Sequence, residues 1–103
     1  MNFDDVVKYL YCEDCGNGQF MIATSVADPS LLVFVYLDKH GYFNIFRSMQ
    51  EYTMYVENIE CDRICINYDD YPNLDEGVDP LDQWLMDNII DIDAAFIKEN
   101  NHD

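Results

Sequence analysis

A stretch that combines carboxylates with tyrosines is the part of the sequence best suited to binding chemistry. Its acidic and aromatic members are Tyr68, Asp69, Asp70, Tyr71, Asp75 and Glu76. Carboxylates form strong bidentate pairs with arginine, and protein interfaces favour rigid aromatic anchors with charge placed around them. The stretch therefore predicts a contact surface for a basic protein, such as a nuclease that holds phosphate with arginines.

The predicted partner surface continues into the segment that follows. Its further acids are Asp79, Asp82, Asp87 and Asp91. Asp87 and Asp91 lie four apart on a predicted helix, where like charges cost a few tenths of a kcal/mol. A solvated outer face explains why these positions are polar. It does not explain why they are all negative, since such faces usually mix lysine with glutamate, so we include these acids in the surface.

The whole chain is also strongly negative. The 103 residues carry a net charge of -16. From Glu51 to the C-terminus there are fifteen acids against Arg63 and Lys98, a net of -13, whereas the first fifty residues have six acids and three bases, a net of -3. Crowded like charges lower the stability of a compact body, so this excess indicates a gain in solubility or a basic partner.

The same negative charge disfavours two classes of ligand. Nucleic acid phosphates and anionic lipid headgroups would both be repelled, so we expect no direct binding of nucleic acid or membrane. The sequence has no export signal and no apolar run approaching the ~20 residues of a membrane span. These features predict a soluble, cytoplasmic protein.

Motifs of catalysis are scarce. The chain has no glycine-rich phosphate loop, no His-Glu-x-x-His and no serine nucleophile motif, and its histidines are His40, in a predicted turn, and His102, near the terminus. The acids from Asp69 to Asp82 lack the ligand order of a helix-loop-helix calcium site. We therefore predict a protein that is not an enzyme, with no catalytic residue and no cofactor.

The cysteines leave one alternative open. They are Cys12, Cys15, Cys61 and Cys65. The first two have the two-residue spacing of a zinc knuckle, while the second two are separated by three residues and lack a following glycine. Reduced thiols are the preferred interpretation, and a small zinc-binding domain is the alternative.

The pattern of residues predicts a single acidic α+β domain over residues 1–103. It consists of an antiparallel meandering sheet of about five strands, with a short N-terminal helix and a long C-terminal helix packed on it. The expected elements are a helix over 2–11, strands over 19–25, 31–37, 42–46, 52–58 and 64–68, an ordered loop over 69–79, and a helix from 80 to about 99.

Two local predictions have clear physical reasons. Asp38 to Gly41 should form a tight turn between strands, with Gly41 free to take a positive φ. Asp79 should cap the last helix and Pro80 should occupy its first turn, where a missing N–H costs nothing. The apolar residues expected to pack this helix on the sheet are Leu81, Leu85, Ile89, Ile92 and Phe96.

Together these observations predict an acidic protein inhibitor. The most favoured version is an immunity protein that blocks the basic active-site or substrate cleft of a nuclease toxin, because the charge is concentrated in one half and interleaved with tyrosines. The alternative is a phage-encoded DNA mimic that inhibits a host defence enzyme of the restriction or CRISPR type. A mimic would space its carboxylates along an elongated surface, roughly 7 Å apart, as phosphates are on one strand.

Overall fold

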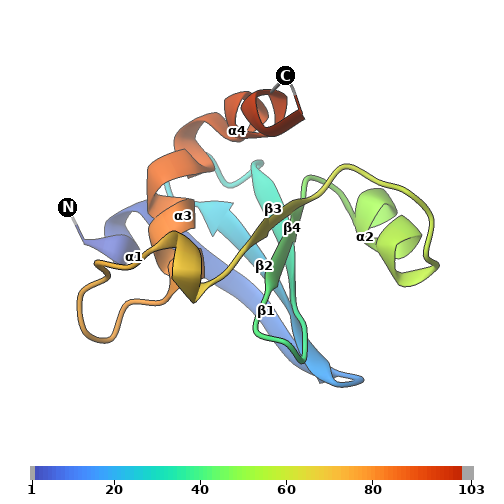
Figure 1. The fold of residues 1–103 in the computed structure, drawn as a ribbon. Helices are drawn as coiled ribbons and strands as arrows, with labels where there is room; N and C mark the ends of the chain where they lie inside the picture. Colours follow the sequence, from blue (N-terminus) through green and yellow to red (C-terminus); the bar gives the residue numbers. More distant parts are fainter. Residues whose placement is uncertain (1, 101–103) are drawn as a thin grey trace.

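A computed structural model describes the backbone of residues 2–100 and the side chains of residues 2–98, so His102 lies outside the described residues. In chain order (Figure 1) the elements are α1 (Phe3–Val6), β1 (Val7–Cys15), β2 (Gly18–Ser25), β3 (Leu32–Leu37), β4 (Phe43–Phe46), α2 (Met49–Val56), β5 (Ile64–Ile66), the 3-10 turn η1 (Tyr68–Asp70), α3 (Pro80–Asn88), the 3-10 turn η2 (Ile89–Asp91) and α4 (Ile92–Asn100). None of the helices in this part of the chain has the length and apolar character that crossing a membrane requires.

The five strands form one antiparallel sheet in the order of the chain, β1-β2-β3-β4-β5. This arrangement, with its short N-terminal helix and its C-terminal helical segment, confirms the predicted α+β class. The apolar strand β3 lies at the centre, as expected. Its Val33 and Val35 belong to one apolar cluster and Phe34 to another, because alternate residues of a strand point to opposite faces.

The larger cluster lies between the sheet and the C-terminal segment, and α3 and α2 cover opposite faces of the sheet (Figure 1). All five residues of the predicted apolar stripe are buried: Leu81, Leu85, Ile89, Ile92 and Phe96. The long C-terminal helix is thus confirmed. It consists of two α-helices, α3 and α4, joined by η2.

The strand predicted over Tyr52–Asn58 is wrong, because this segment lies mostly in the helix α2. The Ser48 hydroxyl accepts the Glu51 backbone N–H at 3.1 Å and caps the helix start. Tyr52 and Tyr55 lie three positions apart, on one side of a helix, and both pack on the smaller cluster of Phe20, Phe34 and Phe46. The aromatic residues that suggested a strand therefore pack on the sheet from a helix.

The helix predicted over residues 2–11 is also mostly wrong. It ends at Val6, and the chain continues as β1, which pairs with β2 from Val7 opposite Ser25 to Cys15 opposite Gly18. Apolar and aromatic residues of this segment match both a helical and an alternating pattern. Hydrogen bonding decides between the two patterns, because β2 follows directly in the sequence and offers this segment a partner strand.

The turn between β3 and β4 is confirmed. Gly41 has a φ of 86°, its N–H donates to the Asp38 carbonyl at 3.1 Å, and His40 lies exposed at the tip. The strand predicted to end at Tyr68 ends at Ile66, since Tyr68 belongs to η1. Beyond η1, the expected loop reaches Asp79 without a further helix or strand.

Gly18 provides a test of this sheet. A Cβ atom there would lie 2.2 Å from the Leu37 carbonyl oxygen and 2.6 Å from the Tyr36 ring. We expect Gly18→Ala to lower the free energy of unfolding by about 1–3 kcal/mol, as overpacking does. The control is Gly16→Asn, because Gly16 has a φ of 60° that asparagine tolerates and no atom lies within 4 Å of a Cβ there. Urea denaturation measures both, and equal stabilities of the two variants would contradict the packing.

Candidate functional site

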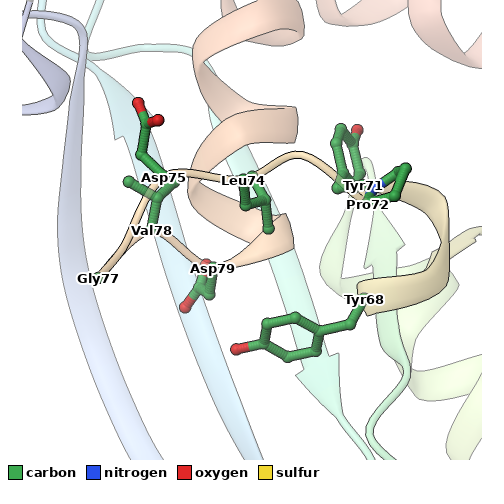
Figure 2. Close-up of a pocket in the computed structure, with 8 residues that line it drawn as sticks. All are labelled: Tyr68, Tyr71, Pro72, Leu74, Asp75, Gly77, Val78 and Asp79. Atoms are coloured by element: carbon green, nitrogen blue, oxygen red, sulfur yellow. The ribbon is translucent and has the colours of Figure 1, made fainter.

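The loop between η1 and α3 encloses a surface hollow of about 670 Å³ (Figure 2). Its lining residues are Tyr68, Tyr71, Pro72, Leu74, Asp75, Gly77, Val78 and Asp79. Four of these, Tyr68, Tyr71, Asp75 and Asp79, are members of the predicted partner surface. The structure therefore brings part of that surface together around a single concave site, with tyrosines and carboxylates on its walls.

Hydrogen bonds hold both ends of this loop. At the start, the Asn67 side chain accepts the Asp69 N–H at 2.9 Å, and the Asp70 carboxylate accepts the Asn67 N–H at 2.9 Å. Near the end, the Val78 N–H donates to the Asp75 carbonyl at 3.1 Å. Tyr71 packs against the larger apolar cluster from the middle of the loop. The shape of the hollow is thus fixed by hydrogen bonds at both ends of the loop and by the packing of Tyr71 on the core.

Asp79 joins the hollow to α3. Its Oδ1 accepts the Asp82 N–H at 2.8 Å, and Pro80 follows in the first turn, so the predicted cap is confirmed. Burial raises the pKa of Asp79, although hydrogen bonds from the backbone N–H groups of Asp82 and Leu81 act in the opposite direction. Asp79 therefore has two roles, one at the start of the helix and one on the wall of the hollow.

Asp82 is not among the residues that line the hollow. Its Oδ1 accepts a hydrogen bond from the Tyr9 hydroxyl at 2.8 Å, which connects α3 to β1. Burial raises the pKa of Tyr9, and the bond to Asp82 raises it further, so Tyr9 stays a donor at neutral pH. This contact spans 73 positions, and nothing in the sequence indicated it.

The remaining predicted residues lie at different distances from the hollow. Asp70 and Gln83 line a second hollow with Tyr71. Asp87 and Asp70 both raise the pKa of Tyr71, after the larger effect of burial, so Asp87 faces this region. Glu76 is exposed beside Asp75. Asp91 is the last residue of η2, where its carboxylate accepts the Ala94 N–H at 3.2 Å, and it does not line the hollow.

The turn between β3 and β4 also borders the site. His40, Gly41 and Tyr42 line a further hollow together with Asn67, Tyr68 and Asp69. Tyr68 consequently lies between two concave regions, and 61% of its surface is exposed. Sequence patterns missed this contact of the turn, because only the pairing of β4 with β5 brings the two segments together.

Two basic residues make their contacts outside the hollow. Arg47 donates to Asp93 at 2.8 Å and lies 3.8 Å from Asp62, with its guanidinium over the Phe96 ring. Arg63 donates to the Asn44 side chain and lies over the Tyr55 ring. No basic side chain is among those that line the hollow. Its carboxylates are therefore not neutralised by a residue on its own walls.

The cysteines do not converge. All four thiols are free, and Cys12 and Cys15 lie three apart on β1, so they point to opposite faces of the sheet. Within the described residues, no group of three or more histidine, cysteine and acidic side chains is placed to hold a metal ion. This geometry gives no support to the zinc-binding alternative.

Comparison of the chain with models of protein families, with curated proteins and with solved structures finds no match. The chemistry of the surface is therefore the guide to what the protein binds.

Asp79 allows its role in the helix to be separated from its charge. Asp79→Ala removes the cap, and we expect it to lower the free energy of unfolding by about 1 kcal/mol, whereas Asp79→Asn keeps a cap oxygen and should lose much less. Because burial raises the pKa of this carboxyl above its ordinary 3.8, the stability it contributes is full below that pH and is lost as the pH rises through the folded pKa.

Wild type and Asp79→Asn should therefore be most alike in acid, and the variant should gain relative to wild type as the pH rises. Urea denaturation of both proteins from acidic to neutral pH measures the difference in their free energies of unfolding. A variant that instead loses stability relative to wild type with rising pH would show that the ionised form is the stabilising one.

Proposed function

We propose that the protein is an acidic inhibitor that binds and blocks the basic active-site or substrate cleft of a nuclease toxin, as an immunity protein does. The observation that carries the proposal is the hollow, where Tyr68 and Tyr71 stand beside Asp75 and Asp79 with no base among the lining residues. Aromatic anchors surrounded by charge are typical of tight protein interfaces. A nuclease cleft offers the complementary arginines and lysines.

The surrounding charge supports the same partner. Between Arg63 and Lys98 the sequence contains nine acids and no base. A field of one sign raises the rate at which an oppositely charged partner arrives, and it repels partners of its own sign. Binding of this kind requires no catalytic group and no cofactor on the inhibitor, and an inhibitor of a nuclease inside the cell would act in the cytoplasm.

The shape favours the immunity version over a DNA mimic. The described part of the chain measures 37 × 31 × 26 Å, so it is nearly as wide as it is long. Two acids and two tyrosines of the predicted surface, Asp75, Asp79, Tyr68 and Tyr71, line one hollow. Such a surface suits a defined partner cleft better than a site that follows a duplex.

The partner can be sought directly, because immunity genes accompany the genes of their toxins in this proposal. The product of the gene immediately upstream is produced alone and together with the protein, and its nuclease activity is measured on DNA and RNA. We expect nuclease activity from the product alone and none from the stable complex. An upstream product that has no nuclease activity, or that does not bind the protein, would contradict the proposal.

Charge reversal tests the predicted surface. Asp69, Asp75 and Glu76 are exposed, and their side chains form no hydrogen bond or ion pair within the described residues. Changing all three to lysine should weaken binding of the nuclease by at least about a hundredfold, since each reversal replaces an attraction with a repulsion. The midpoint of thermal unfolding should change little.

The matched control reverses Asp14, Glu57 and Glu60, three exposed acids on the β1–β2 hairpin and after α2. It changes the net charge by the same amount at another place. Surface plasmon resonance measures both variants. Equal losses of affinity would show that total charge matters and the location does not, which would refute the predicted surface.

A further inference from the structure

We infer that the hollow is a receptor for a single arginine side chain of the partner, with the guanidinium against the Tyr68 ring and the carboxylate of Asp79 beside it. This inference rests on the proposed function and names the group that the site recognises.

The protein contains one complete example of this arrangement. The Arg47 guanidinium lies 5.1 Å from the centre of the Phe96 ring, while its Nη1 donates to the Asp93 carboxylate at 2.8 Å. Ring, guanidinium and carboxylate thus form a triad, in which the ring face and the carboxylate satisfy different parts of one cation. Arg63 uses a ring in the same way, 5.2 Å from the centre of Tyr55.

The hollow contains two of the three components. Figure 2 shows the Tyr68 ring and the Asp79 carboxylate on the same side of the loop, toward which the Leu74 side chain also points, whereas Asp75 projects from the opposite side. The Tyr68 ring has no aromatic or cationic partner among the described residues, and its surface is 61% exposed. The component that is missing from this site is a cation, which the partner would supply.

Arginine suits the site better than lysine does. A guanidinium is planar, stacks on an aromatic face and still donates from its edge to carboxylates, and it is more weakly hydrated than an ammonium. The apolar side chain of Leu74 offers contacts to the methylene groups of an arginine stem. A nuclease arginine that normally holds phosphate would be occupied in this position.

The test uses two synthetic peptides of equal length and charge, an octa-arginine and an octa-lysine, titrated calorimetrically into the full-length protein at low and at high salt. We expect the arginine peptide to bind about three- to tenfold more tightly. Tyr68→Leu keeps apolar bulk and removes the ring face, so it should abolish this preference and leave the lysine peptide unaffected. The matched control is Tyr11→Leu, since Tyr11 is another exposed tyrosine beside a carboxylate, bonded to Glu13 at 2.6 Å.

Three other outcomes would overturn the inference. If both peptides bind equally in a salt-dependent manner and Tyr68→Leu changes nothing, the receptor is refuted while the proposed basic partner stands. If Tyr11→Leu removes the preference as strongly as Tyr68→Leu does, recognition of arginine is not located at the hollow. If neither peptide binds even at low salt, the inference and the proposed function both fail.

Discussion

The packing of the apolar stripe of α3, η2 and α4 against the sheet is the interaction on which the rest of the structure depends. The stripe includes Leu81, Leu85 and Ile89, which are at most 1% exposed. Burial of such side chains contributes about 1.5–3 kcal/mol each. It fixes the position of α3, while β5, paired to β4, fixes the other end of the connecting loop. The hollow therefore exists because the two ends of this loop are held by the core.

This packing also determines where the acids lie. A helical segment that buries one apolar stripe must place the side chains of its other faces outward, so Asp87 and Asp93 are exposed. Some of the resulting repulsion is offset within the fold, since Arg47 connects Asp62 and Asp93 and lies over Phe96. At the hollow no such compensation is present among the lining residues. In the proposed function, a cationic partner would compensate these carboxylates.

The sequence predicted the elements whose local signals were unambiguous. The cap at Asp79, the proline at position 80 and the turn at Gly41 each depend on neighbouring residues alone, and all three are confirmed. The errors fell where two periodicities coincide. The segments that became β1 and α2 contain β-branched and aromatic residues that match either pattern, and contacts with the sheet decided their conformation.

The candidate site was predictable only in part, for a similar reason. The mixture of tyrosines and carboxylates from Tyr68 to Asp79 indicated a contact surface, but their arrangement around a hollow depends on the turns of the loop. The bond from Tyr9 to Asp82 and the approach of the turn at Tyr42 to Tyr68 arise from tertiary structure. Spacing along a chain does not reveal contacts between segments that only the sheet brings together.

In the proposed function, the carboxylates form a surface that attracts a cationic protein partner. The most direct measurement is the association rate constant with the nuclease partner as a function of ionic strength, by stopped-flow fluorescence of the buried Trp84 or of a label on the partner. We expect the association rate constant to fall by at least about tenfold between roughly 50 mM and 500 mM salt, with a much smaller change in the dissociation rate constant. An association rate that is indifferent to salt would contradict the proposed function.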